Sequence, residues 1–100
     1  MIKHIVFWRF NESAYGNDKQ KNARILKEKL LAMKNKVDGI IKVEVGFDFS
    51  TEKDSCDVAL YSEFTTKEAL HQYQGHPDHQ EIKKWLAEVR YERRIVDYEV

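Results

Sequence analysis

The spacing of apolar residues constrains the fold of this chain more than any other feature. The spacing changes along the sequence between a period of two, typical of strands, and a period near 3.6, typical of helices. Strand patterns occupy residues 2–10, 41–49, 57–64 and 94–100, and the clearest alternation runs from Ile41 to Phe49. The sequence therefore predicts four strands separated by turns and helices.

The first helical pattern follows a polar loop at residues 11–17. It is expected to begin at Asp18 and to end at Gly39, because aspartate favours the N-cap and glycine favours the left-handed residue after a helix. Its apolar stripe consists of Ala23, Leu26, Leu30, Met33 and Val37. One face of this helix is therefore expected to pack on the sheet.

Two further helices follow the third strand. The capping box Thr65-x-x-Glu68 predicts the start of the second helix, and Gly75 its end. His76 and Pro77 then suit the N-cap and the first position of a third helix, because proline lacks the N–H that would be unpaired there. The stripe of the third helix is Ile82, Trp85, Leu86 and Val89.

The resulting order, β-α-β-β-α-α-β, is the ferredoxin-like plan of the α+β class. Right-handed crossovers place all the helices on one face of a four-stranded antiparallel sheet. The other face then carries apolar side chains open to water, namely Ile5, Phe7, Ala59 and Tyr61. Such a face is an association site, so we expect a symmetric homodimer through the open sheet face.

Composition narrows the possible partners. The 100 residues suit one domain, residues 1–100, and the 17 basic and 17 acidic side chains leave no net charge to attract nucleic acid. No apolar run is long enough to span a membrane. Cys56 is the only cysteine, so we expect no internal disulfide and a cytoplasmic protein. Phosphate-binding loops and zinc signatures are absent, and we expect no cofactor.

The stretch "YQGHPDH" holds the residues most suited to chemistry. Tyr73 belongs to the inner stripe of its helix, and His79 lies in the first turn of the next helix, where the positive dipole end favours a neutral imidazole. His4 shares a strand face with Trp8. If that face meets the helices, the three side chains converge. A neutral histidine beside a tyrosine hydroxyl could then take a proton next to a carbonyl group and polarise that carbonyl.

Two other interpretations use the same residues. In the first, His76 and Pro77 only start a helix, and His79 bonds a nearby backbone carbonyl. In the second, His71, His76 and His79 bind a metal ion together with Asp78. The helix break between the first two histidines separates them, and no second cluster has metal-ligand spacing. We therefore expect no metal site.

Several segments together resemble a known family. These are "MIKHIVFWRF", "GIIKVEVGFDFS", "DVALYSEFTTKEALHQYQGHPDHQEI" and the closing "VDYE". In this order, over nearly the whole chain, they resemble the stress-responsive dimeric α/β barrel family, called Dabb. The resemblance implies a ferredoxin-like monomer and a homodimer whose two sheets form one barrel.

The resemblance says less about activity, because most members have no established reaction. One plant member is a polyketide cyclase of the olivetolic acid type. Its catalytic tyrosine and histidine match Tyr73 and His79, and its N-terminal pocket histidine matches His4. A further pocket tyrosine of that cyclase falls in the stretch "NARILKEKLLAM", which contains none.

Three hypotheses follow. The first is a stress-responsive homodimer that binds a small apolar or aromatic molecule between sheet and helices. The ligand-binding residues would be His4, Trp8, Tyr73, His76 and His79. The second is a small cyclase or lyase in which His79 is the base and Tyr73 the polarising group. The third is a structural dimer whose pocket is filled by its own side chains. Whether the chain is an enzyme stays open at this point.

Overall fold

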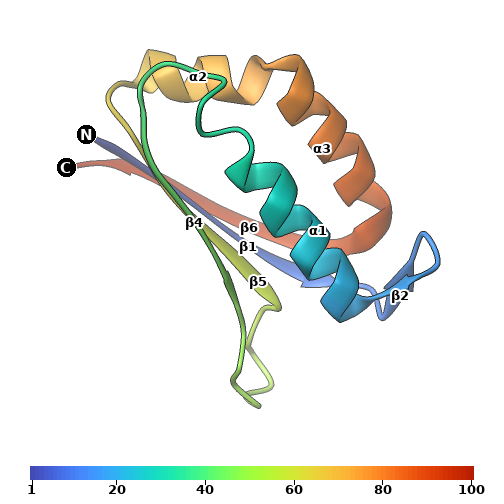
Figure 1. Ribbon diagram of the computed structural model, residues 1–100. Helices are drawn as coiled ribbons and strands as arrows, with labels where there is room; N and C mark the ends of the chain where they lie inside the picture. Colours follow the sequence, from blue (N-terminus) through green and yellow to red (C-terminus); the bar gives the residue numbers. More distant parts are fainter.

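A four-stranded antiparallel sheet with the strand order β4-β5-β1-β6 forms the base of the fold. In the computed structural model, which describes residues 1–100, its strands are β1 (Ile2–Phe10), β4 (Ile40–Phe47), β5 (Val58–Phe64) and β6 (Arg90–Glu99). The helices α1 (Lys19–Leu31), α2 (Lys67–Gly75) and α3 (Pro77–Val89) all cover one face of this sheet (Figure 1). The predicted α+β, ferredoxin-like fold is confirmed.

Strand β1 lies between β5 and β6, and its alternate side chains form the centre of the core. The buried ones are Ile2, His4, Val6, Trp8 and Phe10. The strand register places His4 opposite Ser62 on β5 and opposite Asp97 on β6. Side chains directly opposite one another project from the same face of a sheet. This register therefore brings His4 and Asp97 together on the helix-covered face.

Helix α1 begins as predicted but ends earlier. Asp18 caps it by accepting a hydrogen bond from the Lys21 N–H at 2.8 Å. The predicted extension to Gly39 is wrong, because residues 32–38 form turns after Leu31. Met33 and Val37 are still buried there. Their helical spacing therefore reflects only that both side chains are buried in the core, and the turns after Leu31 bury them as a helix would.

The segment before α1 also differs from the expected loop. It contains a short hairpin of two strands, β2 (Ser13–Ala14) and β3 (Asn17–Asp18). Tyr15 and Gly16 form its turn with positive φ angles of 53° and 74°. A two-residue turn of this kind suits the twist of a hairpin. Strand β4 ends at Phe47, before the fully exposed Phe49, and β6 begins at Arg90 rather than Arg94.

The caps of α2 and α3 position the candidate site. The N-cap of α2 is Thr66 and not Thr65, and its hydroxyl accepts a hydrogen bond from the Ala69 N–H at 3.1 Å. The Thr65 N–H instead donates to the Gly39 carbonyl at 2.8 Å, which keeps that residue outside the helix. His76 caps α3 as predicted, and Pro77 follows at its first turn.

The sheet face opposite the helices is uncovered (Figure 1). We call it the open sheet face; its apolar side chains are Ile5, Phe7, Ala59, Tyr61, Val96 and Tyr98. Phe7 is 40% exposed, and Val96 and Tyr98 are exposed to a similar degree. None of the helices is both long enough and apolar enough to cross a membrane.

Candidate functional site

A small cavity lies between the sheet and the helices α2 and α3. Its volume is about 30 Å³, which has room for one or two water molecules. Ligand pockets usually measure several hundred Å³, so this cavity is much smaller than a pocket for a drug-sized molecule. Its polar lining side chains are His4, Trp8, Tyr73, His79, Lys83 and Arg93.

Three elements supply the central groups of the cavity. Tyr73 comes from the buried stripe of α2, His79 from the first turn of α3, and His4 from β1. The ring centroids of Tyr73 and His79 are 4.6 Å apart, and those of His4 and Tyr73 are 6.3 Å apart. The structure thus places side by side the three residues for which convergence was expected. Trp8 is only 3% exposed and lines the same cavity.

Three buried polar atoms at this cavity have no hydrogen-bond partner within the chain. They are Nε1 of Trp8, the hydroxyl oxygen of Tyr73 and Nδ1 of His79. Buried polar groups are nearly always paired, and an unpaired one costs about 1–3 kcal/mol. Three such atoms around one cavity form a set of donors and acceptors suited to a polar ligand.

The electrostatics of the site keep both reactive groups uncharged at neutral pH. Burial, followed by the positive charge of Lys83, lowers the pKa of His79 from 6.5 to about 4. Burial also raises the pKa of Tyr73 above its ordinary value. The neutral His79 expected from the helix dipole is therefore found, but burial is its main cause. The Gln74 backbone acts in the opposite direction and raises the pKa of His79. No hydrogen bond of ordinary geometry, however, pairs Nδ1 of His79 with another group of the chain.

His4 is held from both neighbouring strands. Its Nδ1 lies 2.5 Å from Oδ1 of Asp97, and the Ser62 hydroxyl donates to its backbone carbonyl at 2.9 Å. A carboxylate at Nδ1 favours the tautomer that carries its proton there, and it fixes the orientation of the ring. Asp97 is not among the site residues predicted from the sequence, because only the register of β6 against β1 shows that it lies opposite His4.

His76, which the sequence predicts to be a ligand-binding residue, does not line the cavity. Its Nδ1 accepts a hydrogen bond from the Asp78 N–H at 3.0 Å, which is the capping interaction of α3. Lys36 Nζ contacts the Asp78 carboxylate and ties the end of the α1 region to the start of α3. His71 faces a different surface hollow, between α2 and β6. No group of three or more His, Cys, Asp or Glu side chains could hold a metal ion.

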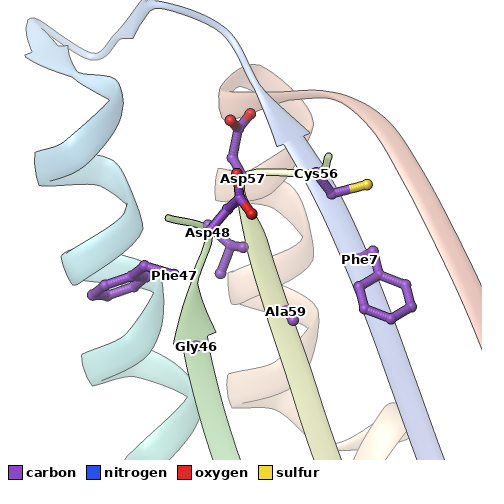
Figure 2. Close-up of a pocket in the computed structure, with 8 residues that line it drawn as sticks. Phe7, Gly46, Phe47, Asp48, Cys56, Asp57 and Ala59 are labelled. Carbon is purple, nitrogen blue, oxygen red and sulfur yellow. The ribbon is translucent and has the colours of Figure 1, made fainter. Parts of the chain in front are cut away.

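A larger hollow, of about 280 Å³, lies at one end of the open sheet face. Figure 2 shows Phe7, Ala59 and Gly46 on three adjacent strands of its wall, with Cys56 and Asp57 just before β5. None of its lining residues carries a buried, unpaired polar atom. Most of its lining is apolar, with Asp48, Asp57 and Cys56 as the other residues, so it differs from the cavity under the helices, where buried polar atoms lack partners.

Comparisons with known proteins agree with the fold. Residues 2–100 match the family model described as the Stress responsive A/B Barrel Domain. A dimeric protein of unknown function with a ferredoxin-like fold, from Bacteroides fragilis, is 33% identical; the alignment covers 99% of this chain and 95% of that chain, with a TM-score of 0.86. No curated protein matches the chain.

Two more distant solved structures share the fold alone. A Dabb family protein from Mesorhizobium loti is 21% identical, with a TM-score of 0.74 and coverage of 99% of this chain and 95% of that chain. A hydroxynitrile lyase from Passiflora edulis is 17% identical, with a TM-score of 0.82 and coverage of 99% and 92%.

Proposed function

Because this chain belongs to the Stress responsive A/B Barrel Domain (Dabb) family, we propose that it binds a small organic molecule between the sheet and the helices. One observation carries this proposal: three buried polar atoms, on Trp8, Tyr73 and His79, meet at one cavity without partners in the chain. A ligand with a carbonyl or hydroxyl group would pair with them and recover the free energy that their burial costs.

The size of the cavity limits the ligand. With about 30 Å³ available, only the polar end of a molecule enters without movement of the helices. The ligand expected from the sequence is apolar or aromatic, and the unpaired atoms add a polar group to that description. Aliphatic side chains such as Leu60 and Leu86 complete the wall and suit the carbon atoms next to that group.

A fragment screen observed by NMR tests the binding proposal. The chain has two tryptophans, so the Trp8 indole N–H signal can be assigned with the variant Trp85→Phe. Small carbonyl and hydroxyl compounds should shift the Trp8 signal, and Tyr73→Phe should weaken their binding by about tenfold, the value of one hydrogen bond. Tyr15→Phe is the matched control, because Tyr15 is exposed and does not line the cavity. A screen that never shifts the Trp8 signal would contradict the proposal.

A second function, catalysis by a small cyclase or lyase, is supported by the protonation states of the site. A neutral His79 can accept a proton at neutral pH, and a protonated Tyr73 can donate a hydrogen bond to a carbonyl group. Their rings lie 4.6 Å apart, close enough for both to act on one small substrate. The shared fold with a hydroxynitrile lyase adds cyanohydrins to polyketides as substrates to assay.

The enzymatic alternative is tested by His79→Ala. If His79 is the base, the variant should lose about 10²–10⁴-fold in turnover of a polyketide or cyanohydrin substrate that the native protein converts. His76→Ala is a useful comparison, because His76 caps α3 but does not line the cavity. Turnover that survives His79→Ala unchanged would remove His79 from the mechanism.

We also propose that the chain forms a homodimer through the open sheet face. Exposed apolar side chains gather there, and the related protein from Bacteroides fragilis is dimeric. A contact of roughly 800 Å² on each copy is typical of a stable dimer. The larger hollow beside Phe7 adjoins this face, so side chains of a second copy could fill it.

Light scattering at micromolar concentration tests the dimer. The native protein should show twice the chain mass of 11.9 kDa, and Phe7→Lys should shift it toward the monomer by placing a charge in the contact. Phe49→Lys is the control, because Phe49 is 98% exposed in the loop after β4 and belongs to no strand of the open sheet face. A native protein that scatters as a monomer would refute the dimer.

We further propose a cytoplasmic location and a role in stress. A single, half-buried Cys56 and no disulfide suit a reducing compartment, and the family name supports the link to stress. Cell fractionation and protein levels after stress would test both. Recovery of the protein only outside the cytoplasm would contradict the first.

A further inference from the structure

Two cationic side chains at the same cavity have no acidic partner. Lys83 and Arg93 line it, are both exposed to solvent, and take part in none of the ion pairs of the chain. Their positive charge reaches the interior, because both lower the pKa of His79. The unpaired polar atoms of the site thus lie beside two unpaired positive charges.

The fold places each cation next to one of the unpaired polar groups. Lys83 lies four residues after His79 on α3, so the two side chains share one face of the helix. Arg93 pairs with Trp8 in the register of β6 against β1, so these two side chains project from the same face of the sheet. The two cations come from different layers, the helices and the sheet, and both line the same cavity.

Three acidic groups on α3 and β6, the elements that carry the two cations, are engaged elsewhere. Asp97, on the same strand as Arg93, binds His4. Asp78, at the start of α3, binds Lys36, and Glu81 on the same helix contacts a different lysine. The positive charge at the cavity is therefore available to a ligand.

We propose that the cavity takes a small carboxylate that also carries a carbonyl or hydroxyl group. Its carboxylate would lie between Lys83 and Arg93, where charge-assisted hydrogen bonds are strong. Its carbonyl or hydroxyl group would reach the buried hydroxyl of Tyr73 and the indole N–H of Trp8. This inference rests on the proposed function, and it adds that the ligand is an anion.

Pyruvate and its neutral amide, pyruvamide, are suitable probes, because they have the same shape and differ in charge. The Trp8 indole N–H signal of the native protein reports occupancy of the cavity for either probe. At constant ionic strength we expect saturable shifts with pyruvate and binding about tenfold weaker with pyruvamide. The double variant Lys83→Gln, Arg93→Gln should remove this preference for pyruvate. Its Trp8 signal without a probe should match that of the native protein, which shows that the variant is folded.

A matched control carries the same loss of charge elsewhere. Lys84 is on the same helix but pairs with Glu81, and Arg24 is exposed on α1 and does not line the cavity. The double variant Lys84→Gln, Arg24→Gln should keep the preference for pyruvate. If it loses the preference to the same extent, overall charge and not the site selects the anion, and the inference is overturned.

Two other results would also overturn the inference, and they differ in whether the proposed function survives. If pyruvamide shifts the Trp8 signal as effectively as pyruvate, the cavity binds small molecules but does not select anions. The proposed function then survives and only the inference fails. If neither probe shifts the signal, the inference fails, and the fragment screen decides the proposed function separately.

Discussion

Replacing Tyr73 by phenylalanine removes one buried hydroxyl and leaves the rest of the side chain in place. The tyrosine is 1% exposed, and its hydroxyl has no hydrogen-bond partner within the chain. Its ring packs against Phe64 and His79 with centroid separations of 5.2 Å and 4.6 Å. A phenylalanine ring keeps these contacts, so the substitution isolates the contribution of the hydroxyl.

The expected change in stability follows from the missing partner. A paired hydroxyl contributes about 0.5–1.5 kcal/mol, so its removal normally destabilises a protein, whereas a buried unpaired one costs about 1–3 kcal/mol. Tyr73→Phe should therefore be at least as stable as the native protein, with a gain of up to about 1–3 kcal/mol. The same substitution should weaken ligand binding, because it removes the hydroxyl with which the ligand would form a hydrogen bond.

Urea denaturation at a fixed protein concentration measures this change. For a domain of this size a gain of about 1 kcal/mol would raise the urea midpoint by roughly 0.5–1 M. Tyr15→Phe should leave the midpoint unchanged, because Tyr15 is 56% exposed and forms no hydrogen bond through its hydroxyl. If Tyr73→Phe lowers the stability by more than about 1 kcal/mol, the hydroxyl has a partner and the reasoning about the site is refuted.

Two further predictions concern pH and the backbone. His79 has a folded pKa of about 4 against 6.5 for the free side chain, so the unfolded chain binds the proton first and stability should fall as pH drops from about 6.5 to 4. Because the ring is only half-buried, solvent screening reduces this loss of stability to about 1–2 kcal/mol. His79→Gln should remove the loss when urea denaturation is measured across this pH range. A variant whose stability falls with pH as steeply as that of the native protein would contradict the lowered pKa of His79. Gly39→Ala should lower the melting temperature, because Gly39 has φ +90° and a Cβ there would lie 2.7 Å from the Ala69 Cβ and 2.8 Å from the Thr65 hydroxyl. Gly75→Ala has open space and should change the melting temperature little, and equal losses in both variants would contradict the steric explanation.

Local patterns predicted the fold class because strands and helices impose different spacings on apolar residues. The alternation of β1 and β5 and the helix start at His76 and Pro77 are found in the structure. Membership of the Dabb family, inferred from segments along the whole chain, is confirmed by the match over residues 2–100. Local patterns failed to predict where elements begin and end. The predicted N-cap Thr65, for example, instead donates its N–H to the Gly39 carbonyl, a tertiary contact that no local pattern contains.

The sequence by itself determined which side chains face inward: His4 through the alternation of β1, and Tyr73 and His79 through the helical pattern interrupted at Gly75. Only the tertiary structure decided what surrounds them. Asp97 lies opposite His4 and Arg93 opposite Trp8 because of the register between the first and last strands. Such pairings join residues about ninety positions apart in the chain, as the 93-residue separation of His4 and Asp97 shows. A periodic pattern records which face a residue occupies, whereas strand register and helix packing, which depend on the whole core, select its neighbours.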